Sequence, residues 1–325
     1  MLRKKTHAWV GAIVMTALCC FPFPNASGAD THLPYIQNPA FAPSVQARPA
    51  DAKRQSVLYK VSQGGKAIYL FGTVHVGTAA FYPFAPEVQQ ALSEASELVL
   101  ELDTRSSDAF SKAVLQHGSY GKGEHIKNFV TAATMARLTE ALHAVGITVA
   151  SVAHLKPWLI ANILMGLELQ RSGYERSQGN EFVLLEDAQA RGTTVIELES
   201  ADYQLALFDT LSPEQSERYL LESLAALADG TSLRKARSTI DAWASGDGSA
   251  LDALLREAID GDSVTADFTR KVLLGKRNPV MAERIEHLMQ EKRTAFVGVG
   301  LLHMLGTDGL PRLLAQRGYH VERMY

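Results

Sequence analysis

Two short motifs, each a glycine followed three residues later by a histidine, constrain what this chain can fold into more than any other feature. His75 comes just after an apolar run at residues 67–71, and His303 comes just after a similar run at residues 294–299. Apolar runs of this length, rich in β-branched and aromatic residues, are typical of buried strands. We therefore expect each histidine where a strand gives way to a loop.

The two ends of the chain share a longer pattern around these motifs. Each has a strand, the glycine–histidine motif, a loop containing Gly-Thr, a helix opened by Pro86 or Pro311, and another strand. Between them, hydrophobic residues recur mostly at helical spacing, and residues 157–170 are apolar on nearly every face, as in a buried core helix too short to span a membrane. The pattern predicts an α/β (α+β) fold: a mixed central β-sheet flanked by many helices, with two similar strand–helix–strand units at the ends.

Two further predicted strands, at residues 98–103 and 194–199, carry carboxylates near their ends. Desolvating an unpaired charge costs several kcal/mol, so a buried strand rarely keeps one without a partner. Ligands of α/β sheets collect beyond the carboxyl ends of the strands. The sequence therefore predicts one shared site, formed by His75, His303, Glu101 with Asp103, and either Glu197 or Glu199. The alternatives are hydrogen-bonded structural histidines and a Glu101 on a solvated strand face.

Two imidazoles with carboxylates, and no sulfur, are a ligand set for a divalent metal: Mn, Co, Fe or Zn. The chain has only Cys19 and Cys20, and both lie in its first 29 residues. These residues read as a signal peptide, with basic residues 3–5, an apolar stretch at 8–23 and small residues up to Ala29. We expect cleavage there and export to the periplasm or medium, with an uncleaved anchor as the alternative and no stable membrane span in the mature chain.

Composition limits the partners and the domain plan. The net charge is -3, from 32 basic and 35 acidic residues, so no positive field favours nucleic acid. Residues 30–55 are rich in proline without hydrophobic periodicity, which is typical of a flexible lead-in. The remaining residues, 56–325, are predicted to form a single domain with a helical middle section. A peptide or a small molecule is the expected substrate.

Taken together, the motifs resemble those of the TraB/GumN family, which is related to the Tiki metalloproteases. The resemblance covers nearly all of the mature chain. It rests on Leu70-Phe71-Gly72-Thr73-Val74-His75, Leu100-Glu101-Leu102-Asp103, Glu197-Leu198-Glu199 with Gln204 and Phe208, Trp243 with Gly246-Asp247, Lys276-Arg277-Asn278-Pro279-Val280-Met281-Ala282 and Val297-Gly298-Val299-Gly300-Leu301-Leu302-His303.

The resemblance implies a fold of the erythromycin esterase and ChaN-like kind and a metal-dependent hydrolytic site. Arg277 and Asn278 match polar residues that the family places near this site. From the residues alone, Asn278 could equally cap a helix starting at Pro279, and Arg277 could pair with any surface carboxylate. Many members have Gly-x-Asp where this chain has Gly179-Asn180-Glu181, which leaves a role for Glu181 in doubt.

The leading hypothesis is an exported metallohydrolase with peptidase-like chemistry. His75, His303 and Glu101 would hold the metal, Glu199 would orient or deprotonate a water, and Arg277 would stabilise an oxyanion or a substrate carboxylate. The alternative is a non-catalytic, peptide-binding or regulatory protein of the same fold. A dinucleotide site at residues 298–303 is disfavoured, because histidine stands where helix packing requires glycine or alanine.

Overall fold

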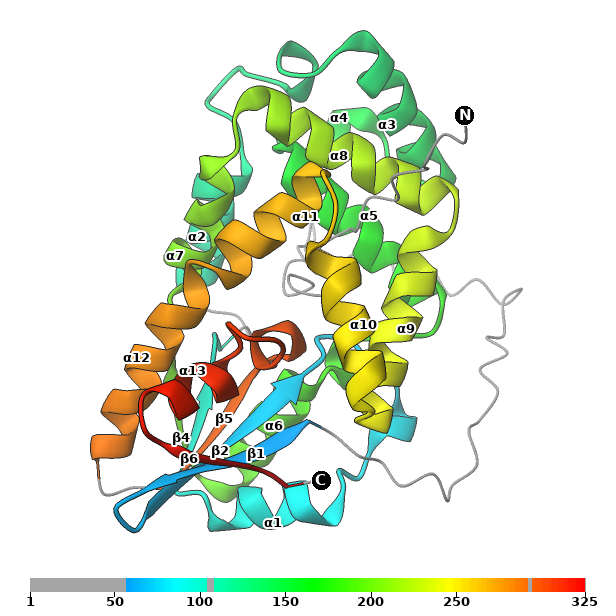
Figure 1. Ribbon diagram of the computed structural model, residues 1–325. Helices are drawn as coiled ribbons and strands as arrows, with labels where there is room; N and C mark the ends of the chain where they lie inside the picture. The colour runs from blue at the N-terminus through cyan, green and yellow to red at the C-terminus, as the bar shows by residue number, and fades with distance from the viewer. Residues whose placement is uncertain (1–56, 104–107, 292–293, 325) are drawn as a thin grey trace, which may run out of the picture.

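The computed structural model describes residues 57–103, 108–291 and 294–324, so the signal peptide and lead-in predicted for residues 1–55 lie outside the described residues. A six-stranded mixed sheet with the order β4-β3-β5-β2-β1-β6 lies at one end of the molecule (Figure 1). The strands are β1 (Leu58–Gln63), β2 (Lys66–Thr73), β3 (Glu97–Leu100), β4 (Thr194–Glu197), β5 (Ala295–Gly300) and β6 (His320–Arg323).

Four neighbouring strands of this sheet run parallel. β5 lies between β2 and β3, and β4 continues the parallel set beyond β3. β1 pairs antiparallel with β2 and with β6 at the other edge. The carboxyl ends of β2, β3, β4 and β5 therefore open at the same edge of the sheet, which is where the predicted site residues follow.

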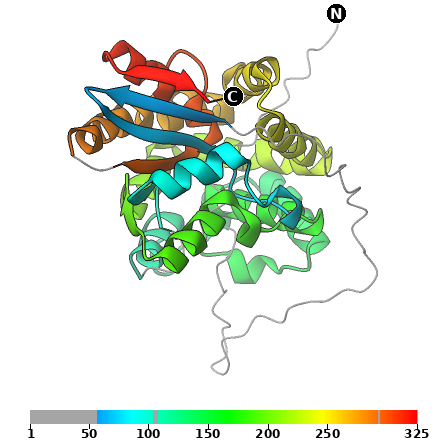
Figure 2. The ribbon, with the colours of Figure 1, turned by 90° about the horizontal axis from the view of Figure 1, so that it is seen from below.

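Helices cover both faces of the sheet. α1 (Pro86–Glu94) and α6 (Asn180–Arg191) lie against one face, and α12 (Arg277–Gln290) and α13 (Leu310–Gln316) lie against the other (Figure 2). Proline opens α1, as predicted from its fixed backbone angle and its missing N–H. The strand cores are fully buried, since residues such as Leu70, Leu98 and Val297 have no or almost no exposed surface.

The middle of the chain forms a helical section at the far end of the molecule from the sheet (Figure 1). α5 (Pro157–Arg171) is buried along most of its length, which confirms the predicted core helix. A capping box formed by Ser212 and Gln215 opens α8 (Pro213–Ala228). The other helices of this section are α2 (Asp108–Gly118), α3 (Ala132–Ala144), α4 (Val149–Val152), α7 (Ala201–Ala206), α9 (Thr231–Ser245), α10 (Gly248–Ile259) and α11 (Val264–Phe268). Of these, α9 and α10 reach back to the sheet (Figure 1), where Trp243 Nε1 donates to the Gly72 carbonyl at 2.8 Å.

A π-helical turn, Thr269–Leu274, links α11 to α12 and brings α12 back towards the sheet (Figure 1). Because this turn carries the helical path onward, α12 begins at Arg277 and not at Pro279 as predicted. No helix among the described residues is long and apolar enough to span a bilayer.

The mixed sheet with flanking helices confirms the predicted fold class. Two strands end earlier than predicted, β3 at Leu100 and β4 at Glu197, so Glu101 and Glu199 follow the strands instead of lying inside them. The two loops still run side by side, because the Glu199 N–H donates to the Glu101 carbonyl at 3.0 Å. Both carboxylates are thus held at the sheet edge.

Candidate active site

His75, His303 and Glu101 meet around Gly300 at the carboxyl edge of the parallel strands. A methyl group placed on Gly300 would lie 3.3 Å from Glu101 Oε1, 3.6 Å from His303 Cδ2 and 3.7 Å from His75 Nε2. The Gly300 N–H itself donates to Glu101 Oε1 at 2.6 Å. Three chemically active side chains therefore surround one point of the backbone.

Arg277 is the central cation of the site. Its Nε donates to both oxygens of Glu199 at 3.1 and 3.0 Å, and its Nη2 lies 2.6 Å from Glu199 Oε2 and 2.5 Å from Glu101 Oε2. Gln204 completes this network, because its amide donates to Glu199 Oε2 at 2.8 Å and to Glu101 Oε2 at 3.2 Å. One guanidinium thus bridges two carboxylates in a buried, bidentate arrangement.

The network fixes the charges of its members. Burial by itself raises the pKa of Glu101, but Arg277 and the nearby histidines outweigh it and hold that pKa well below its usual range. Burial likewise lowers the pKa of Arg277, and the two carboxylates outweigh it and raise that pKa. Glu101 is therefore an anion and Arg277 a cation at any physiological pH.

His75 is held by Glu181, the second residue of α6. His75 Nδ1 lies 2.8 Å from Glu181 Oε1, and the same oxygen accepts a hydrogen bond from the Thr73 hydroxyl. Burial alone lowers the pKa of His75, but the Glu181 carboxylate outweighs it and the net pKa is raised. The opposite holds for Glu181: burial raises its pKa and His75 brings it below the ordinary value.

Hydrogen bonds between the loop after β2 and the start of α6 position His75 beside Glu181. Asn180 Oδ1 accepts from the Val74 N–H at 2.9 Å, and the Asn180 N–H donates to the Val74 carbonyl at 3.0 Å. A methyl group on Gly179 would lie 2.3 Å from the His75 carbonyl oxygen, so only glycine allows this approach. The loop after β2 and the start of α6 are therefore locked together.

His303, in the short helical turn Leu301–Met304 after β5, has a different partner. Its Nδ1 lies 2.5 Å from Asn278 Oδ1, and the Asn278 amide donates to the Asp308 carbonyl at 2.7 Å. Because Asn278 presents its oxygen to the ring, Nδ1 carries the hydrogen and Nε2 carries the lone pair. Burial and the Arg277 charge lower the pKa of His303 to about 3, so the ring is neutral.

The structure brings together six residues that the sequence or the family resemblance had pointed to: His75, Glu101, His303, Glu199, Arg277 and Asn278. Of the two alternatives Glu197 and Glu199, the structure places Glu199 in the site, since it is 3% exposed and bonded to Arg277. Glu197 is exposed, and its Oε1 accepts the Asp103 N–H at 2.7 Å. The alternative assignments for the α12 residues were wrong. Arg277 pairs with buried carboxylates, and Asn278 lies inside the helix and bonds a ring.

Two residues reach the site without having been assigned to it. Glu181 was left in doubt, and Gln204 entered only as part of the family pattern. The available signal was positional, since Gly179-Asn180-Glu181 opens a helix and an acidic residue in a first turn can point back at a neighbouring strand end. No spacing in the sequence relates residue 181 to residue 75.

The nitrogen and oxygen donors of the site match a divalent metal in chemistry. His303 Nε2 is buried with no hydrogen-bond partner in the described part of the chain, and it lies 3.7 Å from Glu101 Oε1. Both imidazoles have their Nδ1 bonded to a second residue, the usual arrangement for metal-binding histidines. Two imidazoles with an adjacent carboxylate suit a borderline metal. Within residues 57–103, 108–291 and 294–324, however, no three His, Cys, Asp or Glu side chains already have metal-ligand spacing.

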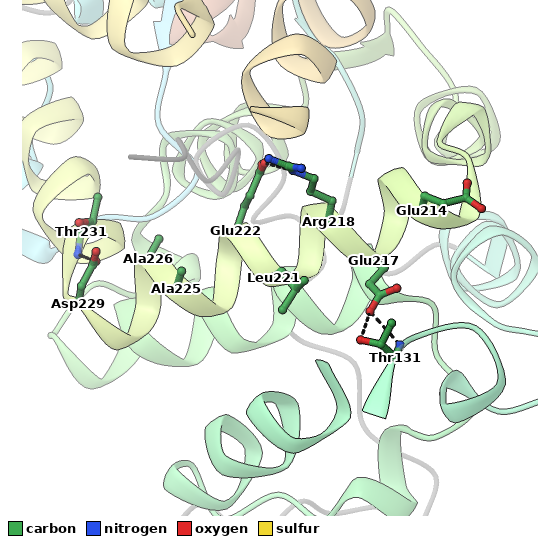
Figure 3. A pocket seen from close by; sticks show the side chains of 10 residues that line it. All are labelled: Thr131, Glu214, Glu217, Arg218, Leu221, Glu222, Ala225, Ala226, Asp229 and Thr231. Atoms are coloured by element: carbon green, nitrogen blue, oxygen red, sulfur yellow. Dashed lines mark hydrogen bonds and ion pairs between the residues drawn. The ribbon is translucent and has the colours of Figure 1, made fainter. Parts of the chain in front are cut away.

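A cavity of about 610 Å³ lies elsewhere, along α8 (Figure 3). None of the site residues lines it. Two of its acidic side chains make structural contacts. Glu217 accepts hydrogen bonds from the N–H and the hydroxyl of Thr131 at 2.8 and 2.7 Å, and Glu222 pairs with Arg218 at 3.4 Å. The candidate active site at the sheet edge is therefore separate from this cavity.

The fold and the sheet-edge site together define an α/β protein with paired strand-end histidines around a buried carboxylate–guanidinium network. The TraB/PrgY/gumN family model matches residues 57–323, and the chain belongs to that family. It is similar to the uncharacterized protein YbaP of Escherichia coli strain K12, at 23% identity over 251 residues covering 77% of this chain and 89% of the relative. YbaP of Shigella flexneri matches with the same identity and coverage. No solved structure matches the chain.

Proposed function

We propose that the protein is an exported, metal-dependent hydrolase with peptidase-like activity. The observation that carries the proposal is the convergence of His75 Nε2, His303 and Glu101 Oε1 around Gly300, each within 3.7 Å of one point. An imidazole lone pair that is buried without a partner is costly unless a ligand uses it. Family membership supports the same proposal, since the family resembles the Tiki metalloproteases.

In this proposal His75 and His303 hold the metal through Nε2, and Glu101 supplies the third ligand. A bound divalent metal would polarise a carbonyl and lower the pKa of a water molecule. Glu181 and Asn278 orient the two rings, because each accepts a hydrogen bond from the Nδ1 atom of its ring. Metal binding at His75 requires loss of the Nε2 proton, so affinity should increase with pH.

Arg277 and Glu199 would support the reaction without binding the metal. Glu199 is buried, and its oxygens are bonded to Arg277 and Gln204, so its geometry favours orienting the guanidinium over deprotonating a water. Arg277 places a fixed positive charge beside Glu101, where negative charge on a reacting carbonyl oxygen would be stabilised. The site residues thus supply ligands and a preorganised cation.

Metal content and peptide hydrolysis of the purified mature chain test this function. His75→Ala and His303→Ala should each lower bound metal and reduce hydrolysis by about 100-fold or more. His143→Ala, on the exposed side of α3, is the matched control and should retain both. Unchanged metal binding in both site variants would refute the assignment. Amino-terminal sequencing of the exported protein tests export, with a start near residue 30 expected.

A non-catalytic peptide-binding protein is the second candidate, favoured by one observation. The two carboxylates that could act as a base, the partly buried Glu101 and the buried Glu199, are already paired with Arg277. Such a site could bind a peptide carboxylate or carbonyl without cleaving it. Stoichiometric peptide binding with no cleavage in the presence of Mn, Co, Fe or Zn would establish this candidate over the hydrolase.

A further inference from the structure

A second buried histidine lies in the helical section, on the face of α2 that packs against α7. His117 Nδ1 is 2.6 Å from Asp209 Oδ2, and His117 Nε2 is 2.9 Å from Asp202 Oδ1. An ionised carboxylate only accepts hydrogen bonds, so both ring nitrogens must donate. This geometry requires an imidazolium ring, with one proton on each nitrogen.

The two aspartates belong to the segment that follows Glu199 in the chain. Asp202 is in the first turn of α7, and Asp209 is in the 3₁₀ turn Leu207–Thr210 that continues it. His117 therefore holds this segment near both of its ends. Between them lies Gln204, whose amide donates to Glu101 Oε2 and Glu199 Oε2 in the site.

We propose that His117 is a positioning residue whose imidazolium ring clamps α7 against α2, so that Gln204 stays bonded to the Glu101–Glu199–Arg277 network. The clamp is made when the ring is charged and opens when it loses a proton. This inference goes beyond the proposed function, because it concerns the placement of α7 and holds whether or not the site hydrolyses a peptide.

The surrounding charges favour the protonated ring. Asp202 and Asp209 face it from α7 and the turn after it, and Lys156, which precedes α5, pairs with Asp209 Oδ1 at 2.6 Å. From α2 itself, the neutral Gln116 amide donates to Asp202 Oδ1 at 3.3 Å. Burial alone lowers the pKa of His117, but the two aspartates outweigh it and the net pKa is raised. Loss of the proton would leave a ring lone pair facing a carboxylate oxygen.

The sign of the pH effect follows from this raised pKa. The clamp is fully made below the ordinary histidine pKa of 6.5 and is lost as pH rises through the folded value. Opening of α7 should increase up to about tenfold per pH unit across that interval and then level off, because one proton is released on opening.

Hydrogen exchange of peptides covering residues 200–210, corrected for the intrinsic rate at each pH, tests the clamp in the mature chain. In the wild type, protection should fall as pH rises above 6.5. His117→Gln should remove this pH dependence, while His143→Gln, on the exposed side of α3, should keep it.

A second variant keeps the test valid if His117→Gln folds poorly. Asp202, with a side chain 66% exposed, can be changed to Asn, which retains an acceptor for Nε2 and removes its charge. The fall in protection should then level off at a lower pH, and the Gln204 side-chain amide signal in NMR should follow the same curve. Protection that does not depend on pH, or an unchanged curve in Asp202→Asn, would overturn the proposal.

Discussion

His75 and His303 stand at the same place in two similar strand ends, yet their environments shift their pKa values in opposite directions. His75 has a carboxylate, Glu181, at Nδ1, and its pKa is raised. His303 has an amide oxygen, Asn278, at Nδ1, and burial beside Arg277 lowers its pKa to about 3. A shared motif therefore fixes where a ring stands, while the charged groups and the burial around each ring set the direction of its pKa shift.

The largest expected effect comes from removing Arg277, the cation whose charge helps to lower the pKa of His303. Arg277→Met would leave Glu101 and Glu199 buried without their partner, so the free energy of unfolding should fall by about 3–5 kcal/mol. The pKa of His303 should also rise, because the Arg277 charge helps to lower it. Denaturant unfolding and histidine NMR titration measure the two effects. Arg312→Met, at an exposed position of α13, is the control. A stability loss below about 1 kcal/mol would show that the network is not buried as described.

Exchanging the kind of residue that bonds Nδ1 in each ring should narrow the difference between the pKa values of His75 and His303. In the metal-free protein, Glu181→Gln should lower the pKa of His75, since the amide oxygen still accepts but carries no charge. Asn278→Asp should raise the pKa of His303 above about 3, at the cost of the hydrogen bond to the Asp308 carbonyl. NMR titration of the ring signals measures both. If neither pKa moved, the assignment of the partners would be wrong.

The same contrast predicts how stability changes in acid. A ring with a lowered pKa stabilises the fold above the ordinary value of 6.5 and loses that contribution as pH falls towards about 3, because the unfolded chain binds the proton. Asn278→Asp should weaken this acid sensitivity relative to the wild type. Unfolding free energies measured between pH 7 and pH 4 should show it, and parallel pH curves would contradict it.

The sequence carried enough information for the strands and for the common edge. Apolar runs located β2 and β5, and the rule that strand ends gather ligands placed His75, His303, Glu101 and Glu199 together. The partners could not be predicted in the same way. Glu181 reaches His75 across 106 residues and Arg277 reaches Glu199 across 78; such contacts depend on how α6 and α12 pack on the sheet, which local patterns do not encode.

Strand ends and helix starts were also shifted by a few residues for physical reasons. Glu101 and Glu199 lie in loops that remain hydrogen-bonded to each other, so alternation along a strand does not apply to them. The π-helical turn before α12 moved its start to Arg277 and removed the expected cap at Asn278. Both shifts place polar side chains at the sheet edge, where the site forms.

The most direct test of the shared site is a zinc titration of the mature chain that follows the ring signals of His75 and His303 by NMR. The account predicts that both sets of signals shift together and saturate at one equivalent of metal, with the pH dependence of a site that loses a proton on binding. Signals that respond separately, or a metal that perturbs only one ring or neither, would contradict a single site built from both histidines.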